Sequence, residues 1–278
     1  MKRTSKILAV GAAVLIIGVV VWIIGMSIIG WDFSRLDNTE YTARSYACED
    51  EVQSISVSLS SFPLTVKKGN RVSLDYYEAD NSEVFVEEKD GVLSVVEKYQ
   101  YRPFSSGLFN ISRASHKFTL TVVSGAKLEI DGHNSDIFIE DIDFTEFSMH
   151  STNTSIRFRR VQFGKLNIKS TNCDIELNGC KASDMTVKST NLDITAKNCE
   201  FDSAVIDGTN VDCELESVVL DKLSIDATNL DADIEIVGTE SEYTVRASGR
   251  GMPANRTGTT DKLIELKGVN NDVELKFV

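Results

Sequence analysis

From residue 128 onward, apolar and polar residues recur along the chain with a fixed period of 19 positions. Asparagine marks the period, because every interval between its successive copies has the same length. Repeats this short, and rich in β-branched residues, predict a solenoid in which each unit forms one coil stacked on the next. The recurring asparagines are Asn134, Asn153, Asn172, Asn191, Asn210 and Asn229.

Within each repeat the apolar residues lie two positions apart, as pleated strands require. In the unit around Asn172, Leu166 and Ile168 come before the asparagine, and Ile175 and Leu177 come after it. The spacing is even before the asparagine and odd after it, so the alternation breaks at the Thr-Asn dipeptide. This break predicts a corner there, because Asn tolerates the left-handed backbone of a tight turn. At a coil spacing of about 4.8 Å, stacked amides bond one another, which predicts an internal, structural asparagine ladder.

The same pattern divides the rest of the chain. Before the regular repeats, shorter alternating runs include a hairpin with the turn Asp90-Gly91, a pair typical of two-residue turns. The whole is predicted to be an all-β, single-stranded β-solenoid (β-helix) with 19-residue coils, preceded by one N-terminal transmembrane helix. The predicted segments are a stalk or linker at 30–50 and a solenoid domain at 51–278, comprising an irregular first part (51–127), regular coils (128–241) and a capping region (242–278).

Residues 7–29 contain no charged residue and are long enough to cross a bilayer as a helix. A cleaved signal peptide is the alternative, but the run exceeds the usual apolar region and no A-x-A-like site closes it. Lys2, Arg3 and Lys6 precede the run, and this excess of cations places residues 1–6 in the cytoplasm. The pattern therefore predicts a single-pass protein of the cell membrane with its C-terminal domain outside the cytoplasm.

The formal charge of −13 argues against nucleic acid as a partner and against flat docking on anionic lipid. It is compatible with a soluble surface and with the binding of cations or cationic polymers. The sequence contains no metalloprotease, nucleophile-elbow or phosphate-loop motif. No enzymatic activity, cofactor or metal is therefore expected.

An acidic column lies two residues after the asparagines, and Ser155 interrupts it. The alternation places this column on the outer surface, where stacked carboxylates repel one another. One interpretation is that each aspartate caps its own corner by accepting backbone N–H groups, and this is favoured. The other is a surface facing divalent cations or a glycan. The column consists of Asp136, Asp174, Asp193, Asp212 and Asp231.

Two of the five cysteines, Cys180 and Cys199, occupy the same inward column of neighbouring coils. Cysteines in such a column usually act as small apolar residues. A disulfide between the two is the alternative.

A segment rich in serine and aromatic residues, 99–117, separates the irregular strands from the strand pattern that follows. Aromatic residues on an exposed loop often anchor proteins or sugars, although they could equally cover the first coil. The candidate contact residues are Tyr99, Tyr101, Phe104 and Phe109.

A spanning helix, a GWDFS-like exit, a KDG hairpin and repeated T/S-N-x-D-I coils resemble the bacterial "putative adhesin" domain-of-unknown-function family. The resemblance covers most of the chain from the helix onward. It implies a membrane-anchored β-repeat protein of the bacterial envelope, and it supplies no catalytic residues.

These observations lead us to expect a non-enzymatic envelope protein that presents its solenoid for adhesion or surface interaction, with a surface glycan or a protein as partner. A self-associating scaffold or a sensor of envelope state is the alternative. A carbohydrate-active β-helix enzyme is a third hypothesis, for which Arg157, Arg159 and Arg160 beside Asp174 and Glu176 are the nearest approach to a catalytic group.

Overall fold

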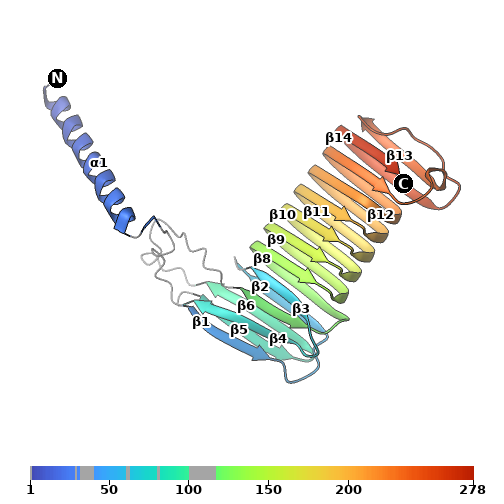
Figure 1. The fold of residues 1–278 in the computed structure, drawn as a ribbon, viewed down its shortest axis with the longest axis horizontal. Coiled ribbons are helices and arrows are strands. Elements are labelled where there is room, and N and C mark those ends of the chain that lie inside the picture. Colours follow the sequence, from blue (N-terminus) through green and yellow to red (C-terminus); the bar gives the residue numbers. More distant parts are fainter. Residues whose placement is uncertain (1, 29, 32–40, 61–62, 80–81, 100–116) are drawn as a thin grey trace. The chain divides into compact units, whose positions relative to one another are not determined.

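The computed structural model describes residues 2–28, 30–31, 41–60, 63–79, 82–99 and 117–278. The chain forms two compact units. One contains the N-terminal helix. The other contains all of the strands (Figure 1).

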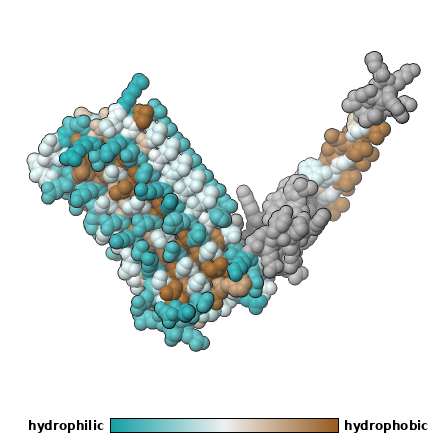
Figure 2. Space-filling model, turned by 180° about the vertical axis from the view of Figure 1, so that it is seen from behind, coloured by the Kyte–Doolittle hydropathy of each residue, from teal (hydrophilic) through white to brown (hydrophobic). Residues whose placement is uncertain are grey.

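Helix α1 runs from Lys2 to Ile28, and its segment Val10–Ile28 has a mean hydropathy of 2.5. Only 6% of this segment is buried within the protein, so its apolar side chains form a continuous exposed surface (Figure 2). Burial in lipid would remove this surface from water, and this transfer is strongly favourable. By length and composition α1 is therefore suited to cross a membrane, as a single anchor or as a signal sequence.

The second unit consists of strands joined into one sheet that winds around a common core. Its strands are β1 (Tyr41–Ala47), β2 (Ser54–Leu59), β3 (Leu64–Lys68), β4 (Ser73–Ala79), β5 (Ser82–Lys89), β6 (Val92–Tyr99), β7 (Phe118–Val122), β8 (Ala126–Glu140), β9 (Asp143–Arg159), β10 (Gln162–Asn178), β11 (Lys181–Lys197), β12 (Glu200–Ile236), β13 (Tyr243–Arg250) and β14 (Lys262–Phe277), with a short 3₁₀ helix, η2, at Glu240–Glu242.

Strands β8 to β12 form the regular part of the solenoid, and neighbouring coils pair in parallel. Each residue pairs with the residue one period later, as Ile168 does with Val187 and Asn172 with Asn191. The predicted β-solenoid with 19-residue coils is confirmed. Its columns of apolar residues form one buried core, in which Phe158 lies at the centre of an aromatic cluster, 5.2 Å from Phe147 and 5.0 Å from Phe163 between ring centroids.

The left-handed corners do not lie at the asparagines, so that part of the prediction is wrong. They lie seven positions later, where φ is between 51° and 62°. The backbone N–H groups of Asp141, Arg160, Gly179 and Asn198 each donate to a carbonyl in the next coil, as Gly179 does to Lys197 at 2.9 Å. At the asparagines the strand bends but is not interrupted, and none of these residues has a positive φ. The corner residues are Asp141, Arg160, Gly179, Asn198 and Ser217.

The irregular first part supplies an additional coil and an antiparallel layer. Strands β2 and β3 both pair in parallel with β8, so they form a coil that precedes the regular ones. Strands β5 and β6 form the expected hairpin, with positive φ at both Asp90 and Gly91. Strand β1 lies where the sequence pattern predicts a stalk. It pairs with β4, and Arg44 forms a 3.1 Å ion pair with Glu78.

At the C-terminal end the chain order differs from the spatial order. Strand β14 pairs with β12 on one side and β13 on the other, so the last strand of the chain lies between two earlier ones. The buried hydroxyl of Tyr243, in β13, donates to the carbonyl of Leu220 at 2.9 Å. This arrangement covers the core of the last regular coil, as a solenoid end requires.

Candidate functional site: a groove along the asparagine ladder

The six repeated asparagines and Asn270 form one chain of amide hydrogen bonds along the solenoid. Each side-chain Nδ2 donates to the Oδ1 of the asparagine in the preceding coil, at distances of 2.5 to 2.9 Å. Each internal amide is therefore both donor and acceptor. Such a hydrogen bond contributes about 1 kcal/mol net to the stability of the fold, and the hydrogen bonds in a chain polarise one another.

The sequence pattern predicts that the ladder is internal. The asparagine side chains are instead exposed, so the ladder lies on the outer surface. The residue that turns inward at this bend lies two positions before the asparagine, and it is a serine in three of the coils, at Ser151, Ser170 and Ser189. The hydroxyl of Ser189, which is buried, donates to the carbonyl of Asn191 at 2.8 Å. The alternation of side chains therefore breaks with two successive outward residues, Thr190 and Asn191.

The residue that follows each of the six repeated asparagines is buried, and from the third repeat onward it is apolar. The members of this column are Cys173, Leu192, Val211 and Leu230. This column is not among the inward columns predicted from the sequence, although it follows from the odd spacing after the asparagine. Because the column lies between two outward columns, its side chains form the floor of a depression.

This depression is a groove of about 840 Å³ that extends from the coil of Asn153 to the coil of Asn270. One wall is the asparagine ladder and the other is the acidic column, which Asp272 continues into the last coil. The described residues that line the groove include aspartates but no lysine or arginine.

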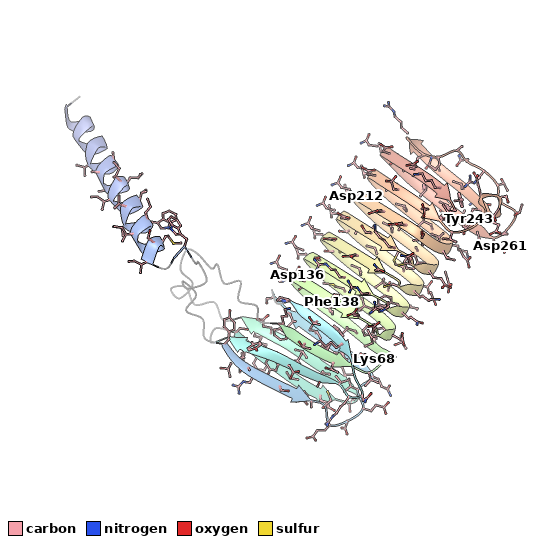
Figure 3. All side chains as sticks on the ribbon, in the orientation of Figure 1. Lys68, Asp136, Phe138, Asp212, Tyr243 and Asp261 are labelled. Carbon is pink, nitrogen blue, oxygen red and sulfur yellow. The ribbon has the colours of Figure 1, made fainter. Side chains whose placement is uncertain are left out.

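The acidic column is exposed, and Figure 3 shows Asp136 and Asp212 on the same side of the stacked coils. Within the described part of the chain its aspartates make no side-chain hydrogen bond and no ion pair, so the favoured capping bonds are not formed. Partial burial, together with the charges of Asp212, Asp174 and Glu214, raises the pKa of Asp193 above its ordinary value. The carboxylates along this wall are therefore mutually repulsive.

Further carboxylates lie beyond the aspartates on the same outer face. Glu214 and Glu216 follow Asp212 at alternate positions and both bind Lys197, at 3.3 and 2.7 Å. These ion pairs raise the pKa of Lys197. The next coil places Asp233 and Glu235 at the equivalent positions. The negative charge of the wall is thus reinforced on its outer side.

The two stacked cysteines are buried and free, and no disulfide joins them. The backbone N–H of Cys180 contacts the Sγ of Cys199 at 3.4 Å. Hydrogen bonding to Cys180 and burial raise the pKa of Cys199, so this thiol stays protonated. Both cysteines pack as small apolar residues in the column of Val161 and Val218.

The aromatic contact loop lies almost entirely outside the described residues. Tyr99 ends strand β6, while Tyr101, Phe104 and Phe109 belong to the segment that is not described.

Of the groups considered for catalysis, Arg157 and Glu176 come together among the residues that the structure describes, as an exposed ion pair. No three of the described His, Cys, Asp or Glu side chains are arranged to hold a metal ion. Arg160 instead binds both carboxylate oxygens of Asp141, at 2.6 and 2.8 Å, which lowers the pKa of Asp141. Arg157 forms a 3.6 Å ion pair with Glu176.

The fold and the groove define a β-solenoid with a regular ladder and an acidic linear surface. Residues 52–250 match the model of the family described as Toastrack DUF4097, and the chain belongs to this family. No curated protein matches the chain.

Two solved structures are similar in fold. A "putative adhesin" from Bacteroides fragilis NCTC 9343 has a TM-score of 0.52 at 15% identity, covering 86% of this chain and 97% of its own. A "putative adhesin" from Parabacteroides merdae ATCC 43184 has a TM-score of 0.51 at 12% identity, covering 87% of this chain and 97% of its own. At these identities the likeness shows the fold alone.

Proposed function

We propose that this protein is a single-pass envelope protein that presents its solenoid outside the cytoplasm for adhesion or surface interaction. Helix α1 supports the anchor, and the excess of cations before it supports a cytoplasmic N-terminus. Both similar solved structures are called putative adhesins, which agrees with a surface role.

The groove is the observation that carries this proposal. A continuous depression over stacked coils offers a long, rigid surface whose shape repeats with every coil, as solenoid proteins use to bind extended ligands. The ladder and the pairing of every coil hold this surface in place without a ligand. Binding to it therefore requires little ordering of the protein, which favours affinity.

The test is co-sedimentation of full-length protein, reconstituted in lipid vesicles, with bacterial cell-envelope fragments. Reversing two charges of the groove wall, with Asp193→Lys and Asp212→Lys, is expected to abolish binding. The matched control, Asp184→Lys and Asp202→Lys, changes the net charge equally at exposed positions outside the groove and is expected to retain it. Equal binding by both variants would contradict a role for the groove. Release of soluble saccharides from the fragments would contradict a non-enzymatic role.

Self-association is the second candidate function, and the last strand favours it. In the described part of the chain, residues 274–277 of β14 pair with β12 but have no strand on their other side, because β13 pairs only as far as Asn270 and the last backbone contact there is from Val273 to Gly251. An unpaired strand edge is a template for another strand. If the protein self-associates through this edge, sedimentation velocity of the detergent-solubilised full-length protein shows oligomers, and Leu275→Pro removes them.

A further inference from the structure

The shape of the groove selects a linear and unbranched ligand. Its floor is a single column of side chains, and its two walls stand on positions only two residues apart in each coil. The floor column is apolar from Cys173 to Leu230, so a ligand lying on it must present apolar groups. At about 4.8 Å per coil, the groove is long compared with its width.

The charge of the groove selects a cation with several charged groups. One wall carries Asp174, Asp193, Asp212, Asp231 and Asp272, one in each coil. These carboxylates make no ion pair within the described part of the chain, and the groove lining contributes no cation of its own. Bound positive charges would remove a repulsion that the folded protein otherwise carries.

The spacing of the carboxylates restricts the ligand further. Asp174 pairs directly with Asp193, and Asp193 with Asp212, so neighbouring carboxylates are one coil apart, or about 4.8 Å. Two amine nitrogens joined by three methylene groups lie about 5 Å apart when the chain is extended, from standard bond lengths. In an extended peptide, side chains on one face repeat every 6.8 Å or so, which does not match.

We propose that the groove binds a linear polyamine, with one ammonium group at each aspartate and the methylene groups on the apolar floor. The exposed amide oxygen at the end of the ladder, on Asn270, adds an acceptor beside Asp272. This inference rests on the proposed function of the groove as a ligand-binding surface and specifies the chemical class of the ligand.

The experiment is isothermal titration calorimetry of the full-length protein in detergent micelles with a linear tetraamine that has three methylenes between nitrogens. Asp193→Asn with Asp212→Asn is expected to weaken binding about tenfold, because two partly exposed charge pairs are lost. The control Asp184→Asn with Asp202→Asn removes the same net charge outside the groove and is expected to leave affinity unchanged. A tetraamine with six methylenes between nitrogens is expected to bind several-fold more weakly.

Equal weakening by the two double variants, or equal affinity for the two tetraamines, would overturn the proposal, since either result indicates only general attraction to an acidic surface. Tighter binding of oligolysine would overturn it in favour of a peptide. Tighter binding of Mg²⁺ would overturn it in favour of a metal site. If the tetraamine does not bind while envelope fragments still require Asp193 and Asp212, the proposed function stands and the polyamine does not.

Discussion

The side-chain amide of Asn191 donates to Asn172 at 2.6 Å, although both side chains are exposed to solvent. Asn191 also accepts a hydrogen bond from Asn210 at 2.7 Å. An exposed hydrogen bond usually contributes little, because water competes for it. In this ladder each amide is held by the pairing of the coils, so that the bond forms without a large loss of side-chain freedom.

Replacing Asn191 by aspartate tests the two-way role of the amide. An ionised carboxylate still accepts from Asn210, but it cannot donate to Asn172, and it adds a negative charge beside the acidic wall. We expect the free energy of unfolding at pH 7 to fall by about 1–3 kcal/mol. The measurement is urea unfolding followed by circular dichroism. Thr190→Ala, at the neighbouring exposed position, is the control, and a loss as large in the control as in Asn191→Asp would refute the ladder's contribution.

The raised pKa of Asp193 predicts a specific pH dependence of stability. Since the folded protein holds this proton more tightly than the unfolded chain does, protonation stabilises the fold. That contribution is fully present below the unfolded pKa and is lost as the pH rises through the raised folded value. Asp193→Asn should therefore be more stable than the parent protein at pH 7 by roughly 0.3 kcal/mol, with the difference shrinking in acid and at high salt. Thermal unfolding between pH 3 and 7 or so would show this, and a variant that is less stable at pH 7 would count against repulsion along the wall.

Gly179 occupies a left-handed corner that other residue types occupy in other coils. Its φ is 62°, while Asn198 has a φ of 54° at the equivalent corner. A Cβ on Gly179 would meet only the Cγ of Arg160, at an ordinary 3.6 Å, so the backbone and not the space limits substitution. Gly179→Val should destabilise the fold by about 1–2 kcal/mol, because a β-branched residue disfavours positive φ. Gly179→Asn should remain within about 0.5 kcal/mol of the parent. Chemical denaturation compares the two, and equal losses would mean that the backbone conformation is not the cause.

Two substitutions of Cys199 test whether the stacked cysteines belong to the apolar core. Val161 and Val218 fill the same column, so Cys199→Val should change the unfolding free energy by less than about 1.5 kcal/mol. Cys199→Ser places a hydroxyl in an apolar column and should cost about 1–3 kcal/mol. The measurement is denaturant unfolding under reducing and non-reducing conditions. A parent protein that loses stability on reduction would instead indicate a disulfide, contrary to the free thiols of the structure.

The sequence predicts the coil length, the parallel register and most inward columns, because each depends on a period that the residues repeat. It does not reveal the left-handed corners, since Asp141, Arg160, Gly179, Asn198 and Ser217 share no residue type. The asparagines' exposure was missed for another reason. Alternation shows that the pattern breaks at Thr-Asn, but it does not show that both of these side chains turn outward.

The groove forms because both side chains of the Thr-Asn dipeptide turn outward, so it could not be predicted without the structure. The acidic column was visible in the sequence, but its relation to the ladder and to the buried column of Leu192 was not. Strand β1 was missed because its side chains are mostly exposed and give no alternating signal.

The most direct test of display outside the cytoplasm is labelling of intact cells with a membrane-impermeant maleimide. The native cysteines that the structure describes are all buried, which leaves an introduced thiol as the principal target. Thr190→Cys places that thiol at the exposed bend of the solenoid, and Ser5→Cys places it before the spanning segment. The proposed orientation predicts that Thr190→Cys reacts in intact cells and that Ser5→Cys reacts only after the membrane is permeabilised. Labelling of Ser5→Cys in intact cells, with protection of Thr190→Cys, would contradict it.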